Sequence, residues 1–149
     1  MNKPHFHVTA GLLWRDGMLL IAKRPQGSHL AGFWEFPGGK QEAREPLKEC
    51  LEREIMEELG IEVHADKPLL VIDHEYEGKT ISLHLFHCSW INGEPAPLAC
   101  DEIKWVRPED LVRYLLPPPD LKLIPFIKKW SEHKYGATGP KNEKLPPVF

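Results

Sequence analysis

The sequence predicts an α+β domain in which strands dominate, and three observations support this class. The first is a series of short β-branched and aromatic runs in which apolar and polar residues alternate. The second is one strongly periodic helix at Leu47–Leu59. The third is the length of 149 residues, which suits one domain with a sizeable core. We expect residues 1–134 to form this domain and residues 135–149 to form a loose C-terminal tail.

The first part of the chain predicts a β-hairpin followed by a loop. Two β-prone runs flank Arg15-Asp16-Gly17, whose Asp-Gly pair is typical of a hairpin turn. Gly, Ser and Pro then indicate a loop, and a short aromatic piece ends at Gly38-Gly39. These segments are His5–Trp14, Met18–Lys23, Pro25–Gly32 and Phe33–Pro37.

The rest of the chain predicts a helix, four extended segments and two further helices. Pro46 suits the start of the first helix and Gly60 suits its end. Acidic residues after Pro108 favour the start of a second helix, and Asp120, after three prolines, can cap a third. The extended segments are Ile61–His64, Leu69–Tyr76, Thr80–Ile91 and Glu102–Val106, with a turn at Glu77-Gly78, and the third helix is Leu121–His133.

Composition and charge exclude several classes of protein. The net charge of -3 gives no basic field, so a nucleic-acid polymer is not an expected partner, whereas a small anion bridged by a cation is compatible. The three cysteines are widely spaced without a CxxC pair, which argues against structural zinc or a disulfide framework. No signal peptide or membrane-length apolar stretch is present. We therefore expect a cytoplasmic protein without membrane attachment, as a monomer or homodimer.

The helix at Leu47–Leu59 carries glutamates at the edge of its apolar stripe. With about 100° per residue and Leu51 as zero, Glu58 falls at roughly -20°, Glu54 at about -60° and Glu57 at about -120°. A solvated acidic face would lie opposite the leucines, but Glu58 and Glu54 border them. Like charges three and four residues apart repel, and burying an unpaired carboxylate is costly. Something positive is needed to compensate.

A hard divalent cation would meet this need. Arg53 projects from the far side of the helix, at roughly 200°, and is not expected to neutralise all three glutamates. Carboxylate oxygens suit Mg²⁺, with Mn²⁺ as an alternative. Gly38-Gly39 precedes the helix and allows the backbone to approach a metal or a phosphate closely. The pattern therefore indicates a metal-bridged site for a polyphosphate.

These residues resemble the Nudix box: Gly39, five residues, Glu45, seven residues, then Arg53 to Ile61 in the order REIMEELGI. Weaker similarity to the MutT branch covers residues 5–130, in "GFWEFPGGK", "ISLHLF", "GEPAP", "EIKWV" and "LLPPPD". The resemblance implies a Nudix fold, which is an α/β/α sandwich with a central mixed β-sheet and a loop–helix–loop catalytic motif. It also implies Mg²⁺-dependent hydrolysis of a (deoxy)nucleoside triphosphate to a monophosphate and pyrophosphate, with 8-oxo-dGTP and CTP among the substrates of the branch.

The resemblance also implies roles for individual residues. It implies metal ligation by Glu54, Glu57, Glu58 and the Gly38 carbonyl, with Glu102 as an outlying acidic ligand or base. It implies that Glu54 is the general base. The catalytic set is Arg53, Glu54, Glu57 and Glu102, in which Arg53 orients Glu54, and Glu45 has the structural role of holding the loop onto the helix.

The residues that contact substrate are less specific in the sequence, because core or surface roles explain most of them equally well. The resemblance indicates Arg24, His29, Phe36, Gly39, Lys40, Lys79, Ile81 and Leu83. Asp120 occupies the place where the 8-oxo-dGTP enzyme has an asparagine that bonds the purine. An ionised Asp only accepts hydrogen bonds, whereas Asn donates and accepts, so Asp120 favours a base that offers an amino or N–H group.

Two alternatives stay open beside the triphosphate reading. One is hydrolysis of another nucleoside diphosphate derivative, such as a dinucleoside polyphosphate or ADP-ribose; Tyr76 faintly favours the dinucleoside type. The other is a non-catalytic nucleotide-sensing module with the same fold, against which the intact Glu54, Glu57 and Glu58 argue. A C-terminal domain of an adenine glycosylase shares "FWEFPGGK"-like residues but needs a catalytic domain that this chain is too short to contain.

Overall fold

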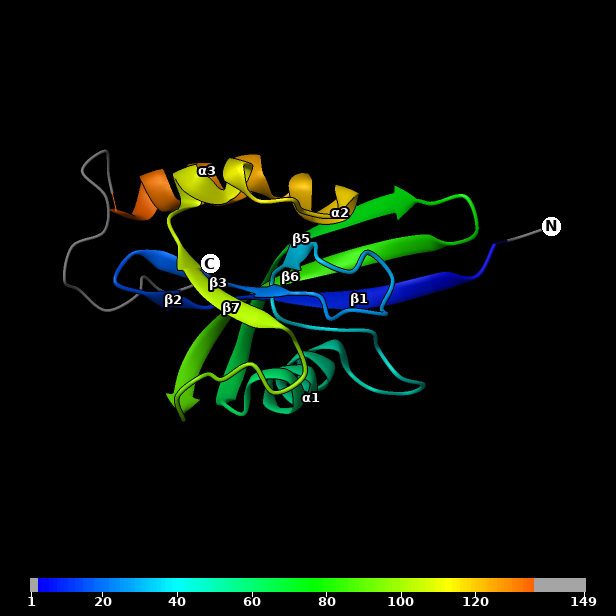
Figure 1. Ribbon diagram of the computed structural model, residues 1–149, viewed down its shortest axis with the longest axis horizontal. Coiled ribbons are helices and arrows are strands. Elements are labelled where there is room, and N and C mark those ends of the chain that lie inside the picture. The colour runs from blue at the N-terminus through cyan, green and yellow to red at the C-terminus, as the bar shows by residue number, and fades with distance from the viewer. Residues whose placement is uncertain (1–2, 136–149) are drawn as a thin grey trace.

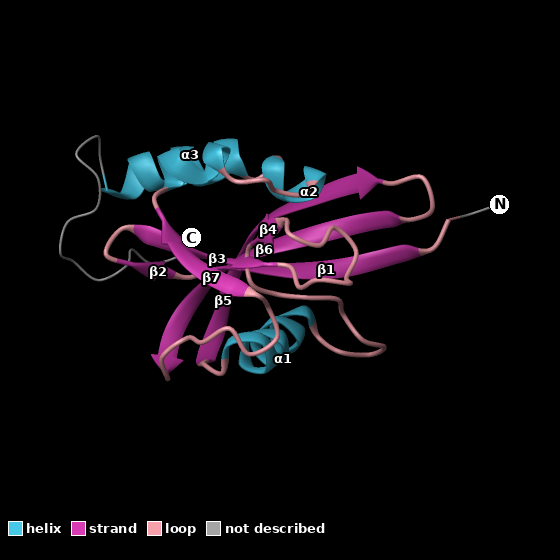
Figure 2. Ribbon diagram, in the orientation of Figure 1, coloured by secondary structure: helices cyan, strands magenta, loops and turns pink. Residues whose placement is uncertain are grey.

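The computed structural model describes residues 3–135, which form one α/β/α sandwich (Figure 1). Helix α1 covers one side of the strands, and α2 and α3 cover the other (Figures 1 and 2). The elements are β1 (His5–Leu12), β2 (Trp14–Arg15), β3 (Met18–Lys23), β4 (Trp34–Glu35), α1 (Leu47–Leu59), β5 (Glu62–Glu75), β6 (Thr80–Asn92), β7 (Glu102–Val106), the 3₁₀ helix η1 (Pro108–Arg113), α2 (Pro118–Leu121) and α3 (Ile124–Tyr135). The α+β class is confirmed. The expected tail at 135–149 lies, apart from Tyr135, outside the described residues.

The strands form two sheets. In the first, β6 lies between β1 and β5 and pairs in parallel with β1 and antiparallel with β5, so this sheet is mixed as expected. In the second, β3 pairs antiparallel with β2, β4 and β7. The expected single central sheet is therefore divided into a three-stranded and a four-stranded sheet. None of the described helices has the length and apolar composition of a membrane-spanning segment.

The expected hairpin between His5–Trp14 and Met18–Lys23 is wrong in its first strand. The Asp16-Gly17 turn is present, and both residues have positive φ, 50° and 77°. Only Trp14–Arg15 pairs across it, because the chain leaves β1 after Leu12 and β1 pairs with the distant β6 in the other sheet. A local turn signal thus identified the turn, but it could not reveal the parallel partner of the first strand.

The predicted boundaries of two later segments, a pair of strands and the final helix, are also wrong. The two extended pieces expected at Ile61–His64 and Leu69–Tyr76 are one strand, β5, whose register shifts around Pro68 keep the ladder continuous. The expected final helix Leu121–His133 is divided into α2 and α3. Asp120 does not cap it: Pro117 is the N-cap of α2, and the buried Asp120 carboxylate accepts a hydrogen bond from the Phe36 N–H at 3.4 Å.

Helix α1 has the predicted bounds, with Gly60 closing it in the left-handed conformation at φ 72°. Leu51, Ile55 and Leu59 are fully buried and pack with residues of β5 and β6, including Val63 and Phe86. A second apolar core lies on the other side of the strands, where Trp14 stacks on Trp130 of α3 at 5.4 Å between ring centroids. The apolar stripe of α1 therefore fixes which of its glutamates face inward.

Candidate functional site

A cavity of about 500 Å³ lies where the loop before α1 meets the ends of several strands. This volume suits a small-molecule ligand. It is lined by β1, by the loop that follows β3, by α1 and by the segment before α2. Twelve residues predicted from the sequence line it: Arg24, His29, Phe36, Gly38, Gly39, Lys40, Glu54, Glu58, Lys79, Ile81, Leu83 and Asp120. The fold therefore brings together three of the five candidate metal ligands, Gly38, Glu54 and Glu58, and all the candidate substrate contacts.

Glu58 is one of the carboxylates that line the cavity. Its Oε1 atom is buried and has no hydrogen-bond partner. Burial raises the pKa of Glu58 to about 8, with Glu35 and Glu54 adding like charge. Burial also raises the pKa of Glu54, although Arg53 opposes that shift. Both carboxylates thus lie where a cation would favour their ionised forms.

Arg53 holds the loop against α1 and contacts two of the candidate ligands. Its Nε donates to Glu45 at 2.6 Å, and its Nη1 donates to Glu54 at 2.8 Å and to Glu57 at 3.2 Å. The hydrogen bond from Arg53 lowers the pKa of Glu45 to about 2. Glu45 also accepts from the backbone N–H of Glu42, which closes the loop. Within the described part of the chain, Arg53 forms no hydrogen bond or ion pair with Glu58, so it does not neutralise all three glutamates, as expected.

Glu57 and Glu102 do not line the cavity. The Glu57 side chain is 58% exposed and contacts Arg53 at the edge of α1. Glu102 is 48% exposed at the start of β7, with Lys104 at 3.9 Å. Cys100, two residues earlier, does line the cavity, and burial raises the pKa of its thiol to about 11. Sequence reasoning missed Cys100, because no spacing marks which residue of this segment turns inward.

Glu35 is a second residue that the sequence reasoning missed. It lines the cavity, and Arg24 donates to both of its oxygens, at 3.1 and 2.9 Å. Burial raises its pKa in spite of Arg24. A signal was present: a charged residue stands between the two buried aromatic residues Trp34 and Phe36, three residues before Gly38. A carboxylate in that position must be paired or functional.

The cavity also has apolar walls. Leu83 and Phe36 are buried there, and Phe36 belongs to the core that includes Trp130 as well as to the cavity wall. Asp120 is also buried, and burial with the nearby Glu35 raises its pKa to about 8. At neutral pH its protonated form can both donate and accept a hydrogen bond.

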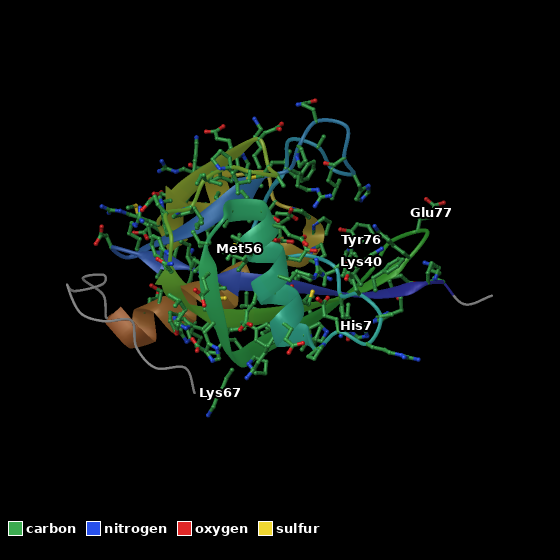
Figure 3. All side chains as sticks on the ribbon, turned by 90° about the horizontal axis from the view of Figure 1, so that it is seen from below. His7, Lys40, Met56, Lys67, Tyr76 and Glu77 are labelled. Atoms are coloured by element: carbon green, nitrogen blue, oxygen red, sulfur yellow. The ribbon has the colours of Figure 1, made fainter. Side chains whose placement is uncertain are left out.

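Cations and aromatic rings lie around this cavity. Lys40 Nζ lies 4.3 Å from the centre of the Phe6 ring, and Lys79 Nζ lies 5.6 Å from that of Tyr76. Tyr76 also packs edge-on against His29, and both line the cavity. Figure 3 shows Tyr76 and Lys40 on the same side of α1. These groups could receive the phosphates or the base of a nucleotide.

Two observations indicate that the residues of this site suit a hard divalent cation. The buried Oε1 of Glu58 lacks a partner, and a Cβ at Gly39 would lie only 2.3 Å from the Glu54 carboxylate, so only glycine leaves room for that side chain. Within residues 3–135, no three His, Cys, Asp or Glu side chains already have a metal-binding arrangement, and Arg53 donates hydrogen bonds to both Glu54 and Glu57. Oxygen donors of this kind favour Mg²⁺ or Mn²⁺.

The buried acids predict a pH dependence of stability in a metal-free buffer. Between about pH 4 and pH 8, folded Asp120 and Glu58 keep protons that the unfolded chain has released. The folded state therefore binds more protons, and the free energy of unfolding should fall as pH increases through this range, by as much as about 1.4 kcal/mol per pH unit for one such group. Urea titrations from pH 5 to 8 with EDTA would measure this.

Asp120→Asn supplies the control, since an amide does not titrate. Its free energy of unfolding should change less steeply with pH than that of the wild-type protein. Equal slopes would contradict a protonated Asp120. Mg²⁺ should stabilise the wild-type protein more at pH 8 than at pH 5, because ionised carboxylates bind it best.

The mixed sheet between helices, with carboxylates gathered beside the Gly38-Gly39 pair in one cavity, defines an α+β protein with a candidate metal site. The family model described as NUDIX domain matches residues 9–125. The chain is 38% identical over 117 residues to the CTP pyrophosphohydrolase of Escherichia coli K12, covering 78% of this chain and 87% of that protein. It is 40% identical over 87 residues to the 8-oxo-dGTP diphosphatase of Proteus vulgaris, covering 58% and 78%.

Solved structures agree with these sequence relatives. The E. coli ORF135 protein superposes with a TM-score of 0.76 at 34% identity, covering 85% of this chain and 91% of that chain. The MutT protein from Methanosarcina mazei Go1 superposes with a TM-score of 0.79 at 25% identity, covering 91% and 99%. The chain therefore belongs to the NUDIX domain family, as a hydrolase of the MutT-like kind.

Proposed function

We propose that this protein is an Mg²⁺-dependent (deoxy)nucleoside triphosphate pyrophosphohydrolase that releases a nucleoside monophosphate and pyrophosphate. The observation that carries the proposal is one cavity that is lined both by the carboxylates of Glu54 and Glu58 and by the buried Asp120 and Phe36. A phosphate chain needs carboxylates that can hold a metal ion, and a base needs an apolar wall with a polar group. The relatives named as 8-oxo-dGTP diphosphatases and a CTP pyrophosphohydrolase support this substrate class.

The proposed reaction is the attack of water on the β-phosphorus. Glu54 takes the proton of the water, and Arg53, which donates to Glu54 at 2.8 Å, holds the carboxylate in position. Glu54, Glu58, Glu57 and the Gly38 carbonyl are the proposed ligands of Mg²⁺, which when bound neutralises phosphate oxygens and lowers the pKa of water. The bond from the β-phosphorus to the oxygen that bridges it to the α-phosphorus breaks, so the monophosphate leaves with that oxygen, and the β- and γ-phosphates with the added water oxygen form pyrophosphate. We assign Lys40, which lines the cavity, to a contact with a phosphate.

The proposed base-reading group is Asp120. Its protonated acid would donate to a ring nitrogen or carbonyl and accept from an amino group, whereas its ionised form would only accept. The edge of cytosine and the oxidised edge of 8-oxoguanine are both compatible with the protonated form. We assign Phe36, Ile81 and Leu83 to the apolar walls that hold the base.

The test is a nucleotide panel with Mg²⁺, in which pyrophosphate and orthophosphate are scored separately. The panel contains canonical triphosphates, 8-oxo-dGTP, ADP-ribose and a dinucleoside polyphosphate. Pyrophosphate release from a triphosphate is the expected result. Preferred cleavage of ADP-ribose or a dinucleoside polyphosphate would show that nucleoside triphosphates are not the substrate class. Binding without Mg²⁺-dependent turnover would identify a nucleotide-sensing module.

Asp120→Asn is expected to shift substrate preference toward 8-oxo-dGTP over CTP when both are measured at pH 8.5. At that pH the wild-type carboxyl is mostly ionised and cannot donate, whereas the amide donates and accepts. One hydrogen bond gained in the complex corresponds to a change in the ratio of kcat/KM values of about fivefold to tenfold. An unchanged ratio would show that Asp120 does not read the base.

A further inference from the structure

A cluster of three histidines lies on the face of the first sheet that points away from the cavity. In β1, Phe6 and Val8 line the cavity, so the alternating side chains of His5 and His7 project from the other face. In β6, Ile81 and Leu83 line the cavity, which places His84 on the same outer face as His7.

Two ring nitrogens in this cluster face each other. His7 Nδ1 and His84 Nε2 are 2.9 Å apart, which is a hydrogen bond when one of these two nitrogens carries a proton, and the ring centroids are separated by 5.2 Å. When each ring carries its proton on the other nitrogen, both of these nitrogens have a free lone pair. His5 is already engaged, because its nitrogens bond Thr80 Oγ1 at 2.6 Å and Ser82 Oγ at 2.9 Å. The His5 ring packs edge-on against His7 with a centroid separation of 4.9 Å and restricts its orientation.

The separation of the two nitrogens matches a metal chelate. Imidazole nitrogens bind first-row transition metals at about 2.0–2.1 Å, so two nitrogens at a right angle around the ion are about 2.9 Å apart, and at a tetrahedral angle about 3.3 Å apart. We propose that His7 Nδ1 and His84 Nε2 chelate a divalent transition-metal ion in adjacent positions of a square-planar or octahedral site, with Cu²⁺ bound more tightly than Ni²⁺ or Zn²⁺. Water fills the remaining positions.

The surroundings favour such an ion. His7 is exposed and His84 is half-buried, so an ion can reach both rings from solvent. Burial lowers the pKa of His84, with His7 acting in the same direction, which keeps a lone pair available at neutral pH. Asp73, whose charge acts on His84, accepts a hydrogen bond from Ser82 and adds a negative charge close to the site. This site is distinct from the carboxylates of the cavity, which prefer a harder ion.

The test uses untagged protein in excess Mg²⁺, so that the carboxylates are occupied. Electron paramagnetic resonance of the wild-type protein loaded with one equivalent of Cu²⁺ should show hyperfine coupling to two imidazole nitrogens. Calorimetry with Ni²⁺ should show at least about tenfold weaker binding for His7→Ala and for His84→Ala. His64→Ala, which removes an exposed histidine on β5, should bind as the wild-type protein does.

Each result either supports the site or overturns it. A Cu²⁺ spectrum without coupling to two nitrogens would overturn it on the wild-type protein alone, whatever the variants do. Unchanged Ni²⁺ affinity in both His7→Ala and His84→Ala would also overturn it. Neither residue lines the cavity, so Mg²⁺-dependent turnover in the two variants reports whether they are folded.

Discussion

Replacing Glu54 with glutamine is expected to lower Mg²⁺-dependent turnover by about 10²–10⁴-fold, the range associated with loss of a general base. Glutamine is close in size and can still accept a hydrogen bond from Arg53, so the fold should persist. It cannot take a proton from water, and it is a poorer ligand for a hard cation. Steady-state pyrophosphate release and Mn²⁺ binding by calorimetry would measure the two effects separately.

Glu58→Gln should also lower turnover, but it should make the metal-free protein more stable. The wild-type carboxyl is buried with an unpartnered oxygen and a pKa of about 8, so at pH 8.5 without metal it carries a costly charge. A neutral amide removes that charge, and the variant should unfold at a higher urea concentration than wild type in EDTA. Thermal or urea denaturation at pH 8.5 would reveal the difference.

Glu49→Gln is the matched control for both variants, because Glu49 is exposed on the same helix and lies outside the cavity. It should retain wild-type turnover and metal affinity. Wild-type turnover in Glu54→Gln would exclude Glu54 as the general base. If Glu58→Gln bound Mn²⁺ like the wild-type protein, Glu58 would not be a metal ligand.

Local signals predicted the elements whose determinants are close in sequence. Helix α1 was predicted with its observed bounds, because Pro46, the leucine stripe and Gly60 all act within one segment. The Asp16-Gly17 turn was predicted for the same reason. The partner of β1 was not predicted, because the paired residues His5 and Thr80 lie far apart in the sequence. The alternation of apolar and polar residues in a strand does not specify which other strand pairs with it.

The candidate site likewise contains residues that local spacing predicted and residues that it missed. Spacing alone identified Glu54 and Glu58, which are one helical turn apart on a helix whose apolar stripe fixes its rotation. Glu35 and Cys100 were missed because they enter the cavity from β4 and from the segment before β7, elements that only the tertiary fold brings beside α1. Asp120 was identified, but its burial, and hence its raised pKa, follows from packing that the sequence does not display.

The Gly38-Gly39 pair gives the second large expected effect, because the two glycines meet different kinds of atoms. A Cβ at Gly39 would lie 2.3 Å from Cδ and Oε1 of Glu54, the far end of a flexible side chain. In Gly39→Ala the Glu54 carboxylate can move away at little cost to the fold, but it then loses its position. Turnover should fall by at least about tenfold with almost no change in the melting temperature.

Gly38→Ala should instead destabilise the protein. Gly38 has φ +152°, and a Cβ there would lie 2.0 Å from the backbone oxygen of Thr9, which belongs to β1 and cannot move aside alone. We expect a loss of about 1–3 kcal/mol in the free energy of unfolding, measured in urea. Gly78→Ala, whose Cβ would meet nothing within 4 Å, controls for both variants. If Gly39→Ala kept wild-type turnover, the observed position of Glu54 would not be the one used in catalysis, whereas an unchanged unfolding free energy in Gly38→Ala would show that the loop does not pack on β1 as it does here.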